Sequence, residues 1–209
     1  GKNPVPGTIL DKWPGGSITQ YWGENPALYS SAFGFFDDIN RYLGGHSGLD
    51  IIGSHRINVV PVFDGIVSSV TLNRVSIGGI MVGITSEELQ DDNNMVRFYA
   101  LYGHLDEAGF VGGQEVKAGQ KGMKMGNTGF VISGGTPYWG DAPAGKGTHT
   151  HFLLQEQIKV GEIWRLRWRN ALGNTMNPLP FLTGKTGGWD IVIENMLALL
   201  RKWKAQFFV

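Results

Sequence analysis

The chain has 209 residues, of which 42% are hydrophobic, so it is long enough to bury a core as one large domain or two small ones. Its 18 basic and 18 acidic residues cancel, which argues against a polyanion such as nucleic acid as the main partner. The absence of cysteine excludes disulfides and thiolate metal ligands, and leaves histidine, aspartate and glutamate to bind any metal. No stretch reaches the roughly 18 apolar residues of a membrane span, and no signal peptide opens the sequence.

The composition is that of a β-rich protein. The chain contains 32 glycines, about twice the usual share, and shows little helical periodicity before residue 189. We therefore expect an all-β fold built on an antiparallel sheet. The expected units are an extended arm over 1–16, the β domain over 17–183, a linker over 184–188 and an appended α-helix over 189–209.

Alternating polar and apolar residues place the strands, while glycine, proline and acidic residues place the connections. Strands are expected at 17–22, 44–53, 75–85, 96–105, 148–154 and 164–169, with two more in 59–70 that pivot on a hairpin-type turn at Asp64-Gly65. The connections are an aromatic-rich segment over 27–43, an acidic loop over 87–94, tight turns over 116–129 and a long loop over 130–147. A loop as long as 130–147 is expected to be functional or mobile.

The segment 44–53 sets a histidine and an aspartate four residues apart in a stretch too rich in glycine to form a stable helix. In a strand, alternate side chains share a face. His46 and Asp50 are therefore expected to project together, with Gly48 between them leaving that face open. One imidazole and one carboxylate on a rigid element make half of a catalytic zinc site, which uses three protein ligands and a water.

Two later segments supply candidates for the other half of the site. His104 comes near the end of the expected strand 96–105, and the strand 148–154 carries His149 and His151 on one face. Each of these histidines taken singly is more often a structural residue, but their occurrence together with Asp50 favours a metal site. Strand alternation by itself does not choose between His149 and His151 as the further ligand.

Three motifs together resemble those of the lysostaphin-type zinc endopeptidases of cell-wall peptidoglycan. The motifs are His46-Ser47-Gly48-Leu49-Asp50, Tyr102-Gly103-His104-Leu105 and His149-Thr150-His151-Phe152. The resemblance covers about residues 17–183 and implies an antiparallel sandwich or half-barrel of this peptidase kind. Two features depart from the family pattern. As many as 19 residues separate Gly129 from His149, and a helix is appended at the C-terminus.

The resemblance also implies roles for individual residues. His46, Asp50 and His151 match the zinc ligands, His104 and His149 match the catalytic pair, and Tyr102, Asn127 and Thr128 are assigned to substrate binding. Bound zinc lowers the pKa of its water to about 7, which makes a nucleophile available at neutral pH. Without the glutamate of a His-Glu-x-x-His motif, an imidazole with an ordinary pKa of about 6.5 is suited to move the proton. As imidazolium, one histidine of the pair would stabilise the oxyanion while the other protonates the leaving amine.

The implied function is zinc-dependent hydrolysis of a peptide bond in bacterial peptidoglycan, in the cross-bridge or the stem peptide. The alternative is a relative without catalytic activity that serves as a wall-binding or phage tail module, and a further one is a zinc hydrolase for a non-wall peptide. The presence of all five polar positions favours the enzyme over the inactive module. The expected place of action is extracellular, periplasmic or virion-associated, and the loop 130–147 is expected to border the cleft.

The last 20 residues differ in character from the rest of the chain. Apolar side chains recur there at helical spacing, namely Ile193, Met196, Leu197, Leu200, Trp203 and Phe207. Such a stripe has to be buried, since each large apolar side chain contributes about 1.5–3 kcal/mol when it leaves water. We expect a protein partner or self-association to cover it, rather than a membrane surface.

Overall fold

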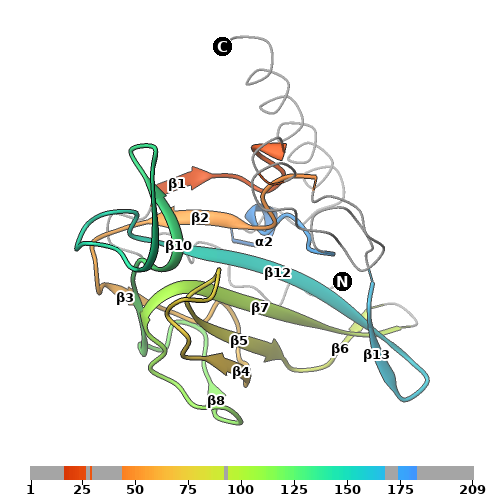
Figure 1. The fold of residues 1–209 in the computed structure, drawn as a ribbon. Coiled ribbons are helices and arrows are strands. Elements are labelled where there is room, and N and C mark those ends of the chain that lie inside the picture. The colour runs from red at the N-terminus through yellow and green to blue at the C-terminus, as the bar shows by residue number, and fades with distance from the viewer. Residues whose placement is uncertain (1–16, 27–28, 30–43, 92–93, 168–173, 183–209) are drawn as a thin grey trace.

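The computed structural model describes residues 17–26, 29, 44–91, 94–167 and 174–182. Within these ranges the chain forms thirteen strands and one short helix, α2, so the expected all-β class is confirmed (Figure 1). The strands are β1 (Ser17–Gln20), β2 (Leu49–Ile52), β3 (Asn58–Val59), β4 (Gly65–Thr71), β5 (Ile80–Ser86), β6 (Leu89–Asp91), β7 (Asn94–Glu107), β8 (Glu115–Val116), β9 (Met123–Met125), β10 (Thr128–Ser133), β11 (Thr136–Asp141), β12 (His149–Val160) and β13 (Ile163–Leu166). The helix α2 covers Leu179–Leu182.

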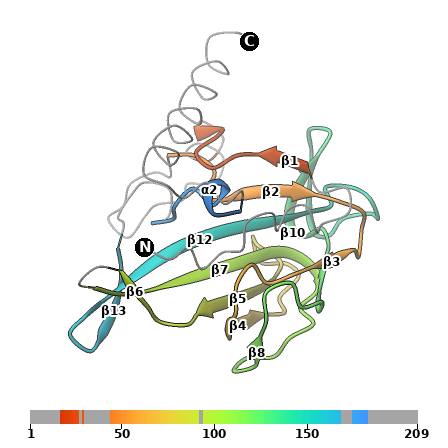
Figure 2. The same ribbon diagram turned by 180° about the vertical axis from the view of Figure 1, so that it is seen from behind.

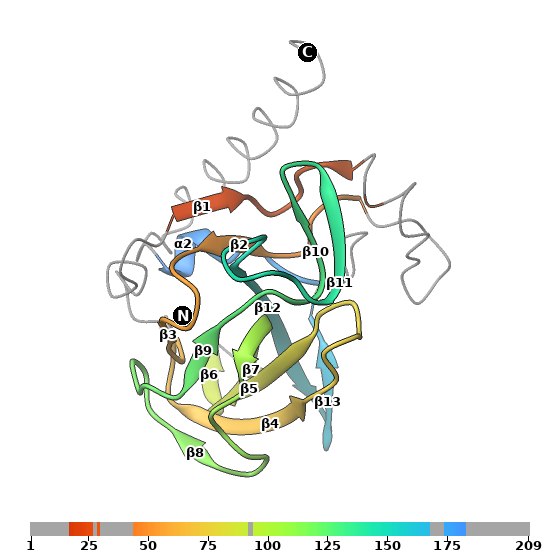
Figure 3. The ribbon, with the colours of Figure 1, turned by 60° about the vertical axis from the view of Figure 1, so that its left-hand side comes forward.

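Eleven of these strands belong to one antiparallel sheet. Its main path runs β1-β2-β12-β7-β5-β4-β8, with β13 paired to β12, β6 to β7, and β9 to both β3 and β7. The two longest strands, β7 and β12, pair along the middle of this path through eight Cα partners. The remaining strands, β10 and β11, form a separate two-stranded sheet. Figure 3 shows this hairpin standing off the large sheet, beside β1 and β2.

Alternation along β7 and β12 gives the sheet one apolar core face. Ala100, Tyr102, Phe152 and Leu154 are all fully buried, and the Tyr102 and Phe152 ring centroids lie 5.2 Å apart. A slip of one residue in this pairing would turn the apolar side chains of the slipped strand to the opposite face, at a cost of about 1.5–3 kcal/mol for each large apolar group. The core therefore holds the register of the two central strands.

The helix α2 packs on the core side of the sheet. The ring of Phe181 lies 5.7 Å from that of Phe98 on β7, and Met176 just before the helix bridges to Leu154 on β12. Figure 2 shows α2 beside β2 and β12 when the molecule is seen from behind. The opposite face of β2, β12 and β7 is left to carry polar side chains.

Three sequence expectations are corrected by the strand pairing. Residues 130–147 are not a plain loop, because β10 and β11 pair in continuous register from Thr128↔Asp141 to Ser133↔Thr136. The strands on either side of Asp64-Gly65 do not pair with each other: β3 pairs with β9, and β4 with β5 and β8. The acidic connection 87–94 contains β6, which pairs back onto β7.

Several expectations fall outside the described residues. These are the arm 1–16, most of the aromatic connection 27–43, the linker 184–188 and the helix 189–209. Within the described part, no helix is long and apolar enough to cross a membrane.

Candidate metal centre

Strand register brings an aspartate and a histidine directly opposite each other. On the path β2-β12-β7, His151 of β12 pairs with Asp50 of β2 on one side and with Gly103 of β7 on the other. The Asp50 Oδ1 and His151 Nδ1 atoms are 3.0 Å apart. Paired residues of an antiparallel ladder point their side chains to the same face, so this contact follows from the register.

His46 reaches the same point from the segment that precedes β2. Its backbone is held by two bonds, from Gly23 N to His46 O (2.7 Å) and from His46 N to Glu24 O (2.8 Å). Gly48 does not leave an open face, as expected from the sequence, because a Cβ there would lie 2.3 Å from the carbonyl oxygen of Phe152. The glycine instead lets this segment cross close to the backbone of β12, which brings the His46 ring over the strand.

The three side chains His46, Asp50 and His151 converge on one point. His46 Nε2 lies 2.8 Å from His151 Nδ1 and 3.1 Å from Asp50 Oδ1, which closes the triangle begun by the 3.0 Å contact. Ligands about 2.0–2.1 Å from a tetrahedral zinc lie about 3.3 Å from one another. The observed triangle is close to one face of such a tetrahedron, so the donor set fits the metal.

Neighbouring oxygens orient both ligand imidazoles. His46 Nδ1 lies 3.3 Å from the Tyr21 carbonyl, which can only accept, so Nδ1 carries the hydrogen and Nε2 presents a lone pair. His151 Nε2 lies 3.4 Å from Ser47 Oγ, which can accept its hydrogen and leave Nδ1 as the ligand atom. In that tautomer His46 Nε2, His151 Nδ1 and the Asp50 carboxylate turn their electron pairs toward one point, which a bound cation would stabilise. In the other tautomer His151 Nδ1 donates to Asp50 Oδ1 instead.

Charge in the cluster is concentrated on Asp50. Burial by itself would raise the pKa of this carboxyl, but the nearby His149 and His46 and the hydrogen bond from His151 outweigh it and hold the pKa well below its usual value. Burial lowers the pKa of His151, against the opposing effect of its hydrogen bond with Asp50. The Asp50 carboxyl and the His151 imidazole are thus kept in the deprotonated form that metal binding requires.

A β-bulge turns His104 toward this cluster. The β5–β7 register shifts between Ile80 and Val82, so that β7 carries one extra residue there. Tyr102 and Leu105, three residues apart, are consequently both fully buried on the core face. His104 sits in the bulge with a φ of 56°, a left-handed conformation that costs a side-chain-bearing residue about 1–2 kcal/mol. Strict alternation would have sent its imidazole into the core with Tyr102.

His104 and His149 form a second pair beside the triangle. Their ring centroids are 4.5 Å apart. Each directs its Nδ1 at a backbone carbonyl, His104 at Thr128 O (2.8 Å) and His149 at Gly147 O (2.7 Å). Because a carbonyl only accepts, each Nδ1 carries the hydrogen and each Nε2 offers a lone pair. His149 Nε2 lies 3.6 Å from Asp50 Oδ1, so the pair borders the carboxylate.

Burial keeps His104 neutral. Removal from water, followed by the charges of His149 and His151, lowers the pKa of His104 to about 3. The bond to Thr128 O acts in the opposite direction without offsetting the burial. At neutral pH this imidazole is therefore unprotonated, with a lone pair on Nε2.

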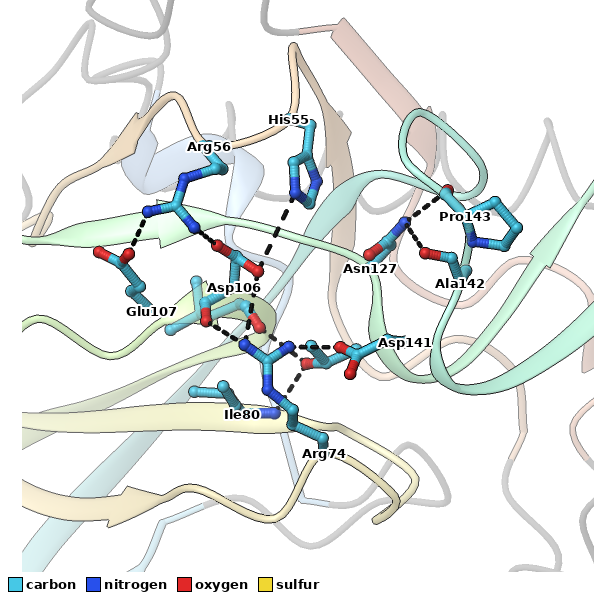
Figure 4. A network of polar contacts seen from close by, with 12 residues as sticks. His55, Arg56, Arg74, Ile80, Asp106, Glu107, Asn127, Asp141, Ala142 and Pro143 are labelled. Carbon is cyan, nitrogen blue, oxygen red and sulfur yellow. Dashed lines mark hydrogen bonds and ion pairs between the residues drawn. The ribbon is translucent and has the colours of Figure 1, made fainter.

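A network of arginines and carboxylates braces the end of β7 and the base of the hairpin. Figure 4 shows Asp106, two residues after His104, between Arg56 and Arg74, and Arg74 reaching Asp141 on β11. Arg74 Nη2 also donates to the Asp106 carbonyl (2.9 Å). Because it is half-exposed and screened by solvent, the network serves mainly to connect the hairpin to the strand that carries His104.

The three residues assigned to substrate binding lie behind the wall of the cleft. Tyr102 and Thr128 are fully buried, and Asn127 is 3% exposed. The Tyr102 hydroxyl accepts from Val62 N, and Thr128 Oγ1 joins the backbones of two strands. Asn127 Nδ2 lies 3.1 Å from the carbonyls of Ala142 and Pro143 (Figure 4) and 2.9 Å from that of Lys146. Their side chains bond within the protein, and substrate contact by these residues stays a prediction.

The cluster lies in an open cleft of about 910 Å³. Thr19, Ile52 and His55 line the side toward β1 and β2, and Ile77, Phe130 and Ile132 line the side toward the hairpin. The sequence reading missed Tyr29, whose ring centroid lies 5.6 Å from that of His46. Burial, and then the charge of Asp50, raises the pKa of Tyr29, and its hydroxyl donates to Gln20 Oε1 (3.3 Å). The only feature of the sequence that pointed to Tyr29 was its position in the aromatic-rich segment 27–43.

Comparison with known proteins identifies the fold. No family model and no curated protein sequence matches the chain. The structure is similar to the catalytic domain of the antimicrobial peptidase lysostaphin from Staphylococcus simulans, with a TM-score of 0.50 and 18% identity over 85% of this chain and 97% of that domain. It is also similar to the longer lysostaphin chain (TM-score 0.52, 17% identity, 90% of this chain covered) and to lysostaphin in solution (0.52, 19%, 89%). This chain spans 56% of the length of each of those two.

Proposed function

We propose that this chain, which has the fold of the lysostaphin catalytic domain, is a zinc-dependent endopeptidase that cleaves a peptide bond of bacterial peptidoglycan. The observation that carries the proposal is the triangle of His46, Asp50 and His151 with the His104–His149 pair beside it. The fold likeness and the three sequence motifs support the choice of a peptidase, and the motifs support the choice of wall peptide. The proposed place of action is accordingly the cell wall, reached from outside the cytoplasm or from a virion.

The donor set favours zinc over the other common divalent metals. Two imidazole nitrogens and one carboxylate oxygen suit zinc, whereas calcium and magnesium prefer oxygen ligands alone. His46 Nε2, Asp50 Oδ1 and His151 Nδ1 would hold the ion. Bound there, zinc would polarise the scissile carbonyl and lower the pKa of a bound water.

The chain's own residues then handle the protons. His104 is neutral and has its Nε2 lone pair available, which is the state that a general base needs before the reaction. The Thr128 carbonyl bonded to Nδ1 fixes this tautomer and favours the imidazolium that forms when the proton is taken. His149, held in the same way by Gly147 O, is the second proton-handling group and faces the leaving amine. His104 is therefore neutral at rest, and its imidazolium arises only during turnover.

The inactive-module alternative is disfavoured by the completeness of the cluster. A relative that serves only as a structural or wall-binding module has no need for five titratable side chains on three separate segments. Here they meet, and every ring nitrogen that points away from the cleft has an acceptor close by. A bulge with a strained φ at His104 is a further cost that packing alone does not require.

The test combines metal content with hydrolysis of purified walls. We expect about one zinc per molecule and release of new amino groups from the wall. His151→Ala should lose the metal, whereas His149→Ala should keep it and lose turnover. His55→Ala is the matched control, because His55 lines the same cleft outside the cluster and its nearest carboxylate, on Asp106, is 4.0 Å away. Full wall hydrolysis by His151→Ala, or zinc-free wild type that cleaves equally well, would contradict the proposal.

A further inference from the structure

The hairpin β10–β11 carries an apolar surface next to the cleft. Trp139 is 58% exposed and Ile132 is 43% exposed. The register pairs Phe130 directly with Trp139, and Ile132 lies two residues beyond Phe130 on the same strand, so the three side chains share one face. We call Phe130, Ile132 and Trp139 the hairpin platform. The opposite face of β10 is anchored, since Val131 is 2% exposed.

The hairpin platform is preorganised. Six consecutive Cα partners join β10 to β11 without a register shift, and the ring centroids of Phe130 and Trp139 are 4.7 Å apart with planes at 49°. The connecting turn, Gly134-Gly135, has positive φ at both positions, as the tight hairpin turns that match strand twist require. A ligand that stacks on these rings therefore meets a surface whose rotamers are already ordered.

The hairpin platform is continuous with the catalytic cleft. Phe130 and Ile132 line the same hollow as His104 and His149. Trp139 is not among the lining residues but lies against Phe130, so it extends this wall outward from the cleft. A substrate held at the histidines and leaving along the hairpin wall would pass over Phe130 first and Trp139 next.

Charged groups beside the hairpin platform restrict the chemical class of ligand that can bind there. Asp141, two residues after Trp139 on β11, has a 61% exposed side chain and is paired with Arg74, which is 39% exposed. A purely apolar partner covering Trp139 would strip water from this ion pair without replacing its hydrogen bonds. A sugar ring has the complementary chemistry. Its C–H face stacks on the negative face of an aromatic ring, and its rim of hydroxyl and amide groups can bond to a carboxylate and a guanidinium.

We propose that the hairpin platform is a carbohydrate subsite that binds a pyranose ring of the glycan strand to which the cleaved peptide is attached. This inference rests on the proposed function and deepens it: the histidine cluster acts on the peptide while Trp139, backed by Phe130, holds the sugar. The inserted hairpin then selects for peptide that is still attached to glycan over free peptide.

The test uses three variants and two kinds of probe. Trp139→Ala removes the exposed ring, Trp139→Phe keeps a stacking ring, and Ile163→Ala is the control, because Ile163 is an equally exposed apolar residue (59%) on β13. Binding of a soluble N-acetylglucosamine oligomer to the full chain is measured by calorimetry. Cleavage is measured on purified walls and on the same peptides freed from the glycan by an amidase.

We expect Trp139→Ala to lose oligomer binding and about tenfold in kcat/KM on walls, equivalent to about 1.4 kcal/mol, with free-peptide cleavage unchanged. Trp139→Phe should recover most of the loss, and Ile163→Ala should behave as wild type. Equal losses on walls and free peptides would assign the hairpin platform to the peptide and overturn the inference, as would wild-type protein that does not bind the oligomer. If no peptide is cleaved at all but oligomer binding depends on Trp139, the subsite stands and the peptidase proposal fails.

Discussion

The strained backbone at His104 leads to a stability prediction that runs against the usual effect of glycine. We expect His104→Gly to be more stable than His104→Ala. Both variants lose the imidazole and its bond to Thr128 O, so the difference between them reports on the backbone alone. Alanine keeps a Cβ at a φ of 56°, which costs about 1–2 kcal/mol, and glycine does not.

The size of the difference follows from two opposing effects. Glycine loses more conformational freedom on folding than alanine, which costs it about 0.5–1 kcal/mol within a strand. Relief of the left-handed strain exceeds this by roughly 1 kcal/mol. For a protein of this size, a difference of that magnitude shifts the melting temperature by about 2–4 °C. The glycine variant should melt higher by this amount.

The assay is thermal unfolding of both variants at one fixed zinc concentration, because metal binding shifts the melting temperature by mass action. Leu101 provides the matched control, since it lies in the same strand and is not among the residues with positive φ. There the order should reverse, with Leu101→Ala more stable than Leu101→Gly. If His104→Ala melts above His104→Gly, the bulge does not hold His104 under strain and the argument is refuted.

Other perturbations probe the rest of the site. Asn127→Ala should cost about 1–3 kcal/mol by leaving buried carbonyls at the hairpin base without a donor, which urea unfolding would show as a lower midpoint at an unchanged slope. The pKa of His104 is lowered to about 3, so between pH 6.5 and 3 the unfolded chain binds the extra proton and wild type loses stability as pH falls. Without metal, His104→Ala should lose less stability than wild type between pH 6.5 and 3. Parallel pH–stability curves for the two proteins would contradict the lowered pKa of His104. Replacing residues 132–137 by an Asn-Gly turn should alter the preference among wall types while zinc content stays constant, and an unchanged preference would make the hairpin tip a mere connection. His149→Ala and His151→Ala should differ in metal content, and equal metal loss in both would refute their separate roles.

The strands that carry the site were predictable because their chemistry is local. Polar and apolar residues alternate through β7 and the first half of β12, and that pattern reports which face is buried. The same rule predicted that His149 and His151 project from one face of their strand. The motif spacing placed His46 beside Asp50, even though the segment before β2 is not a strand and Gly48 serves a close backbone crossing. The sequence therefore predicted which side chains of each segment share a face, but not which segment pairs with which.

Pairing between segments was harder to foresee. The turn at Asp64-Gly65 has the residues of a hairpin, yet β3 and β4 find other partners, because more distant strands cover their edges. The residues 130–147 contain enough glycine to suggest a loop, but Gly134-Gly135 is a turn and the flanking residues pair. Tyr102 and Thr128 stand within or next to motifs, yet both are used in the core.

The sequence by itself determined which residues could do chemistry: five polar side chains on three segments, with no cysteine to compete for a metal. Only the tertiary structure decided how they meet. The β2–β12 register puts Asp50 opposite His151 rather than His149, and one extra residue in β7 turns His104 out of the core and into the cleft. The first outcome depends on pairing between residues about 100 positions apart along the chain, and the second on pairing between residues about 20–25 positions apart. The periodicity of one strand carries no information about its partner's register, so the bulge and the triangle appear only when the sheet is assembled.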